Sequence, residues 1–130
     1  MKNELKFNSQ VCTTKEQSQI LSDLGLERET ADMYYSTNPQ LLFIRDKGIP
    51  LEDEDFPAWS LHRLIEMMPT IITNDDYFLL LGINTTCVYY TDDKYTKTFK
   101  NFEGDLYDCV VKCIEWLIKE GHFNKEYLKQ

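Results

Sequence analysis

Apolar residues recur at helical spacing in three segments of the chain. The first is predicted to begin at Thr13 or Thr14, because a threonine followed three residues later by glutamate or glutamine fits a capping box. Gly25 supplies the left-handed residue with which helices commonly end. The second segment contains Pro57, a residue that suits the first turn of a helix, and it is predicted to end before Pro69.

The third segment, Asp105 to Glu120, carries the strongest helical pattern. Glu115 and Lys119, on its polar face, form an acid-before-base pair four residues apart, and Asp108 and Lys112 form another. Each pair stabilises a helix by only about 0.3–0.5 kcal/mol, so packing of the opposite, apolar face must dominate. That face forms a wide arc of Leu106, Cys109, Val110, Cys113, Ile114, Leu117 and Ile118.

Short runs of aromatic, β-branched and apolar residues between turn sequences predict strands. Tyr34 and Tyr35 predict one strand, and residues 41–45 predict a buried partner strand in the same hairpin. Short connections join the later strands, which favours an antiparallel meander. These later strands are predicted at residues 70–73, 77–83, 87–91 and 95–99.

Together these elements predict an α+β fold, with one domain over residues 1–130. We expect an antiparallel meander sheet of about four to five strands, with about three helices packed on one face. A chain of 130 residues is close to the commonest domain size, and it can bury about two-thirds of its unfolded surface. The ordered core is expected at about residues 11–123, and the polar segment 124–130 is predicted to fray.

Acidic residues outnumber basic ones by 22 to 14, which gives a formal net charge of −8. Phosphate groups are bound mainly by lysine and arginine, so this charge disfavours nucleic-acid binding. The plainer explanation of the charge is that it keeps the protein in solution, and a basic protein partner is the alternative. No pattern in the chain specifies an oligomeric state.

The chain shows no targeting or membrane-spanning pattern. Its first ten residues are polar and lack the apolar region and cleavage site of a secretion signal. The longest apolar run, Phe78 to Leu81, is too short to span a bilayer. We therefore expect a cytoplasmic protein that does not associate with membranes, whose four cysteines are reduced thiols.

Cysteine and histidine spacing gives no metal site. Cys109 and Cys113 share a helical face near His122, but structural zinc needs four ligands, and both cysteines fall within the apolar arc. A core role is favoured, because free cysteine behaves as a small hydrophobic residue. The acidic run 52–55 lacks the residue pattern of a calcium loop. We predict neither a metal nor a cofactor.

His62 and Glu66, four residues apart on the second helix, are the one pair that suggests acid–base chemistry. Without a second histidine-containing motif, an exposed, solvated pair is the favoured interpretation. The chain contains no nucleophile elbow, phosphate-binding loop or dinucleotide fingerprint. We therefore assign no catalytic residue.

Aromatic and acidic residues supply a candidate interaction surface. Tyrosine and tryptophan are enriched at interface hot spots, and one tyrosine of each adjacent pair in a strand should face outward. The alternatives are that these rings only cover the solvent face of the sheet and that the acidic run is only a solvated loop. The candidate residues are Asp53, Glu54, Asp55, Trp59, His62, Tyr89 and Tyr90.

Six short motifs spread over residues 12–123 carry a resemblance. They are Thr14-x-x-Gln17-Ser18, Leu24-Gly25, Thr30-Ala31-Asp32-Met33, Pro57-Ala58-Trp59-Ser60-Leu61, Glu66-x-x-Pro69 and Trp116-Leu117-x-x-x-Gly121. In these motifs the chain resembles a group of small uncharacterised bacterial proteins, often associated with prophages or mobile elements. Residues 64–69 replace the leucine-rich version usual in that group, a volume-conserving exchange. The resemblance implies a shared small fold and brings no activity, cofactor or catalytic residue.

Three functional hypotheses follow. The first is a non-enzymatic interaction or accessory module that binds a protein partner through the aromatic and acidic surface. The second is an acidic mimic of nucleic acid that occupies the binding site of another protein. The third is a small enzyme with a site near His62 and Glu66, which requires these side chains to converge in a cleft with shifted pKa values.

Overall fold

The computed structural model describes residues 10–37, 41–46, 49–73, 78–92, 94 and 98–130. The predicted α+β class is confirmed, with three α-helices and two antiparallel sheets. The helices are α1 (Lys15–Asp23), α2 (Leu61–Met67) and α3 (Leu106–Lys119). The smaller sheet has the order β2-β1-β3, from β1 (Met33–Tyr35), β2 (Leu42–Ile44) and β3 (Phe56–Ala58). The larger sheet has the order β4-β5-β6-β7, from β4 (Ile71–Thr73), β5 (Phe78–Ile83), β6 (Cys87–Thr91) and β7 (Thr98–Glu103).

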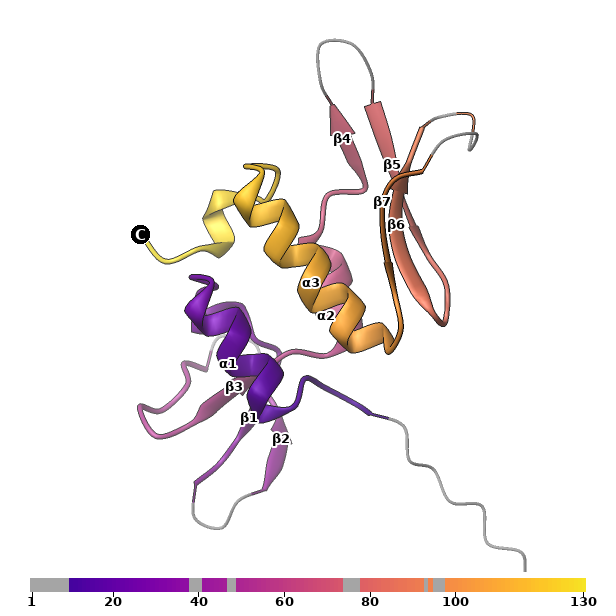
Figure 1. Ribbon diagram of the computed structural model, residues 1–130. Helices are drawn as coiled ribbons and strands as arrows, with labels where there is room; N and C mark the ends of the chain where they lie inside the picture. The colour runs from indigo at the N-terminus through magenta and orange to yellow at the C-terminus, as the bar shows by residue number, and fades with distance from the viewer. Residues whose placement is uncertain (1–9, 38–40, 47–48, 74–77, 93, 95–97) are drawn as a thin grey trace, which may run out of the picture.

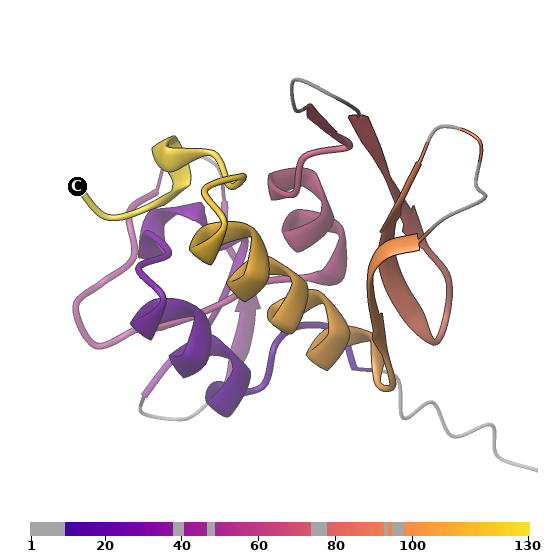
Figure 2. The ribbon, with the colours of Figure 1, turned by 45° about the horizontal axis from the view of Figure 1, so that its top comes forward.

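Helix α3 crosses the middle of the molecule, with the larger sheet on one side and α1 and the smaller sheet on the other (Figure 1). After rotation, α2 is seen beside α3, on the side of the larger sheet (Figure 2). Most of the wide apolar arc of α3 is buried: Cys109, Val110, Cys113, Ile114 and Leu117 are each at most 1% exposed. The structure therefore confirms the core role predicted for the two cysteines.

Both ends of α1 form as the sequence predicts. The Thr14 hydroxyl accepts the N–H of Gln17, and the Gln17 side chain accepts the N–H of Thr14, which completes the capping box. At the other end Gly25 has φ 100°, and its N–H donates to the carbonyl of Ser22 at 3.0 Å. The next N–H, of Leu26, donates to Leu21 at 3.1 Å, so the helix ends in a Schellman motif.

The start of α2 differs from the prediction. Pro57 is not in a helix but in β3, where it lies opposite Tyr34, and the helix begins three residues after β3. Ser60 is the N-cap, because its hydroxyl accepts the N–H of Arg63 at 3.1 Å. Proline is tolerated in an edge strand as well as in the first turn of a helix. Here the pairing of β3 with β1 places Pro57 in the strand. Helix α2 ends before Pro69 as predicted.

The larger sheet confirms the predicted meander. Its last strand spans Thr98–Glu103 rather than 95–99, and residues 95–97 lie outside the described part of the chain. Leu81 lies opposite Tyr90 and Ile83 opposite Val88. These four side chains share the face that packs on α3, and Val88 and Tyr90 are fully buried.

Two other expectations fail. The strand at 41–45 was expected to be buried, but all three residues of β2 are exposed. The segment 124–130 was expected to fray, but it forms a 3-10 turn at Lys125–Tyr127 and bonds to the end of α1. The Lys129 N–H donates to the Gly25 carbonyl at 2.7 Å, and Tyr127 and Leu128 pack against the core. Two apolar side chains and backbone bonds therefore order a segment that looked only polar.

Within the described residues, no helix has the length and apolar content that crossing a bilayer requires.

Candidate functional site

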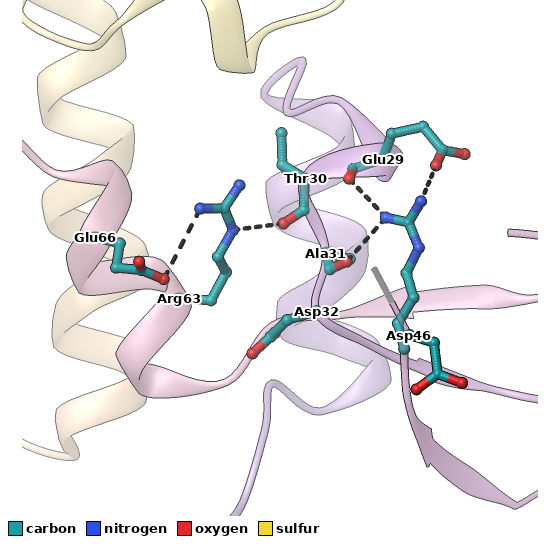
Figure 3. Close-up of a pocket in the computed structure, with 8 residues that line it drawn as sticks. Glu29, Thr30, Ala31, Asp32, Asp46, Arg63 and Glu66 are labelled. Carbon is teal, nitrogen blue, oxygen red and sulfur yellow. Dashed lines mark hydrogen bonds and ion pairs between the residues drawn. The ribbon is translucent and has the colours of Figure 1, made fainter. Parts of the chain in front are cut away.

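A large hollow, with a volume of about 470 Å³, lies between the smaller sheet and α2. Figure 3 shows Arg63 and Glu66 on α2 facing the segment 29–32. Two arginines and four carboxylates make it the natural place to test for catalysis. Its lining residues are Glu29, Thr30, Ala31, Asp32, Arg45, Asp46, Arg63 and Glu66.

All three guanidinium nitrogens of Arg45 donate hydrogen bonds within the fold. Its Nη1 donates to the carbonyls of Glu29 at 2.6 Å and Ala31 at 3.1 Å, and its Nη2 pairs with the Glu29 carboxylate. Its Nε donates to the Ile49 carbonyl at 2.9 Å. Arg45 therefore ties the smaller sheet to the segment that precedes it.

Arg63 and Asp32 also make structural contacts. Arg63 Nε donates to the Thr30 carbonyl at 2.8 Å, so two arginines together hold three consecutive carbonyl groups. The Asp32 carboxylate accepts the Ser60 N–H at 2.8 Å and the Ser60 hydroxyl. These contacts fix the segment 29–32 against the start of α2, so the polar groups of this hollow already serve the fold.

The predicted pair of His62 and Glu66 lies on the surface. His62 Nε2 and Glu66 Oε1 are 3.7 Å apart, and the His62 side chain is 86% exposed. This is the solvated pair that the sequence favoured. Glu66 lines the large hollow and also lies 3.8 Å from Arg63, whereas His62 does not line it. Among the described residues, no cluster of three or more potential ligands could hold a metal ion.

The four cysteines are free thiols, and three of them are buried. Burial raises the pKa of Cys113 to about 12, and burial likewise raises the pKa values of Cys109 and Cys12. These three thiols stay protonated at neutral pH, where the thiolate is the reactive form. Cys87, half-buried on β6, is the accessible one.

We therefore expect one thiol of the four to react rapidly with 5,5′-dithiobis(2-nitrobenzoic acid) at pH 8, and all four to react in denaturant. Replacing Cys87→Ser should remove the rapid phase, and Cys113→Ser serves as the matched control that retains it. A rapid phase that survives in the Cys87 variant would contradict this assignment.

Trp59 and Tyr90 cannot belong to a surface, which corrects the predicted interaction site. Both are fully buried. Trp59 Nε1 donates to the Thr30 hydroxyl at 3.0 Å, and the Tyr90 hydroxyl donates to the Pro69 carbonyl at 2.7 Å. Because the polar end of each ring has an internal partner, burial leaves no polar group unsatisfied.

Tyr89 points to the opposite face of the larger sheet and is partly exposed, as expected for one member of the pair. It lies opposite Gly82, and a Cβ on Gly82 would meet its ring at 2.2 Å. Tyr89 thus covers a glycine on the outer face of the sheet, and neither residue lines a hollow described above.

The predicted acidic loop is on the surface and has a defined conformation. Asp53 and Glu54 are exposed, and Asp55 is partly exposed. Arg28 Nη2 donates to the carbonyls of Glu52 and Asp55, both at 2.8 Å. The Asp55 carboxylate accepts the Glu52 N–H at 2.9 Å. The loop is therefore held in place by its own contacts and by Arg28.

The β2 edge surface, defined as residues 41–44 with Ile49, is the site that the sequence did not reveal. Of the ten large apolar side chains exposed in the described part of the chain, five belong to it. Ile44 is 78% exposed, and Phe43 is 41% exposed while stacking on Tyr34. A concentration of exposed apolar residues marks an interaction site more reliably than single ones do.

Strand β2 is also an edge strand, since among the described strands it pairs only with β1. Leu41 accepts a hydrogen bond from Ser36, and Arg45 donates one to Asp32. Antiparallel hydrogen bonds involve alternate residues, so Leu42 and Ile44 direct their N–H and C=O groups away from β1. Among the described residues, these outward groups have no strand partner, so the outer edge offers backbone groups for pairing beside apolar side chains.

A small hollow of about 160 Å³ joins the β2 edge surface to the acidic loop. Its apolar walls include Tyr34, Ile44 and Ile49. Its charged residues are Asp46, Glu52 and Asp55, together with Arg45, which pairs with Glu29. A lysine or arginine side chain, which has an aliphatic stem and a positively charged end, matches both the apolar walls and the carboxylates. The structure thus brings part of the predicted acidic loop to an apolar strand that was expected to be buried.

Comparisons with protein-family models, with curated proteins and with solved structures found no match for this chain.

Proposed function

We propose that this protein is a non-enzymatic interaction module, which binds an extended, basic segment of a partner protein along β2. The observation that carries the proposal is the exposed apolar edge strand beside an acidic hollow. Extended peptides commonly bind by adding a strand to such an edge, with backbone hydrogen bonds for affinity and side-chain hollows for specificity.

Each feature of the β2 edge surface has a part in this proposal. The outward N–H and C=O groups of Leu42 and Ile44 supply backbone hydrogen bonds. Phe43 offers the partner an apolar ring, which is held in place by stacking on Tyr34 with the ring centroids 5.4 Å apart. The hollow beside Ile44 accepts a lysine or arginine side chain from the partner. The net charge of −8 favours the approach of a basic segment.

The contacts in the large hollow also favour an interaction module over an enzyme. Its arginines and Asp32 are occupied by backbone and cap contacts, and His62 lies outside it. An active site is built from groups that converge on a reacting atom with shifted pKa values. The hollow instead holds two parts of the fold together.

The proposal can be tested with a synthetic eight-residue peptide of alternating lysine and valine. We expect the peptide to shift NMR signals of residues 42–45 and 49–55, and a glutamate–valine peptide of the same length to shift none of them. Ile44→Pro removes an outward N–H, so it should weaken peptide binding about tenfold or more while the fold persists.

Ile71→Pro is the matched control. Ile71 is 52% exposed on β4, an edge strand of the other sheet. The adjacent Thr70 carbonyl bonds to Leu81 on β5, so alternation also directs the Ile71 N–H outward. Equal binding by both proline variants, or shifts confined to other surfaces, would refute the β2 assignment.

A further inference from the structure

A second hollow, of about 270 Å³, lies between α3 and β7, elements that run side by side in Figure 1. It shares no residue with the β2 edge surface. It has an aromatic floor and a basic rim, although the chain as a whole is acidic. Its lining residues are Lys100, Phe102, Lys112, Glu115, Trp116 and Lys119.

Trp116 forms the main part of the floor and is supported by other rings. Its centroid lies 5.8 Å from that of Tyr90 and 5.7 Å from that of His122. Phe102, opposite Val88 in the sheet, completes the floor. Trp116 and Phe102 are both partly exposed, so apolar ring surface remains open to solvent beside a rigid support.

Three lysines surround this floor, with one carboxylate among them. Lys119 Nζ is occupied by Glu115 at 2.7 Å. Lys100 Nζ lies 5.5 Å from the centre of the Phe102 ring. Within the described part of the chain, Lys112 makes no ion pair, because its predicted partner Asp108 instead accepts a hydrogen bond from Gln17 at 2.6 Å. The lining carries a net charge of about +2, from three lysines and one glutamate, in a protein whose total is −8.

From this geometry we propose that the hollow binds a small aromatic anion, of one or two rings. The ring packs against Trp116 and Phe102, while the anionic group pairs with Lys112 and Lys100. The volume of about 270 Å³ lies just below the range of about 300–1,000 Å³ typical of drug-sized ligand sites. That size favours a compact ligand.

Three probes separate the contributions of ring and charge. We expect 2-naphthalenesulfonate to shift the indole N–H signal of Trp116 in NMR titrations and to leave that of the buried Trp59 unchanged. 2-Naphthylmethanol has the ring without the charge, and methanesulfonate has the charge without the ring. Both should bind at least tenfold more weakly, and added salt should weaken binding of the sulfonate.

The double variant Lys100→Gln and Lys112→Gln should raise the Kd for 2-naphthalenesulfonate about tenfold. Lys15→Gln with Lys125→Gln makes the same change in total charge away from the hollow and should leave the Kd unchanged. Equal binding of 2-naphthylmethanol, equal binding by the two double variants, or tighter binding of a thymidine oligonucleotide would each overturn the proposal. None of these outcomes depends on peptide binding at β2.

Discussion

Replacing Trp59→Ala is expected to lower the free energy of unfolding by about 3–5 kcal/mol, the range found when large aromatic side chains are removed from cores. Trp59 is fully buried, and it joins three parts of the fold. Its indole N–H bonds to Thr30, and its backbone N–H donates to the Thr13 hydroxyl at 3.0 Å. Thermal and urea unfolding of the variant would measure the loss.

The other tryptophan provides the control for this experiment. Trp116 is partly exposed, and among the described residues its indole N–H makes no hydrogen bond. Trp116→Ala should therefore lower the free energy of unfolding clearly less than Trp59→Ala does. If Trp59→Ala instead left stability unchanged and abolished partner binding, the earlier expectation of Trp59 as an interface residue would be restored.

Replacing Asp32→Ala should lower the free energy of unfolding by about 2–3 kcal/mol, because hydrogen bonds to charged groups contribute more than neutral ones. The Asp32 carboxylate accepts two hydrogen bonds from Ser60, the residue that caps α2. Without it, the Ser60 N–H loses its partner, and the start of α2 loses its anchor to the segment 29–32. Urea unfolding followed by circular dichroism would measure the change.

Asp46→Ala is the matched control, since Asp46 lines the same hollow and is exposed. Its loss should change stability by no more than about 0.5 kcal/mol, as is usual for surface substitutions. Equal effects of the two substitutions on the free energy of unfolding would contradict the structural role of Asp32.

Local sequence patterns predicted those parts of the fold that local interactions determine. The capping box at Thr14, the glycine at 25, the end of α2 before Pro69 and the bounds of α3 all depend on residues within one or two turns. The meander follows in the same way from short connections between strands.

Burial depends on which elements pack together, and this limited the prediction of the site. Residues 41–44 are apolar in sequence like a core strand, yet their side chains are 37–78% exposed. Trp59 is of a residue type that is enriched at interfaces, yet its side chain is fully buried and its indole N–H has an internal partner. Within the predicted interaction site, the acidic residues at 53–55 lie on the surface, and the apolar strand beside them was missed.

The geometry bears on the other functional hypotheses in different ways. An enzyme at His62 and Glu66 stays a prediction; Glu66 lines the large hollow and His62 lies outside it. The nucleic-acid mimic stays a prediction, as does the association with mobile elements. The lysines around Trp116 show that the negative charge is not uniform over the surface.

The hydrogen bonds between the end of α1 and residues 127–129 close a very long loop. Lys129 Nζ reaches the Ser22 carbonyl across 107 residues of chain. Non-local contacts form slowly, since the entropy of closing a loop must be overcome before the contact is gained. The meander and α3 are close in sequence and can form early, whereas α1 and the final turn can join only when both ends of the chain are in place. Closure of this long loop is therefore expected to be a late step in folding.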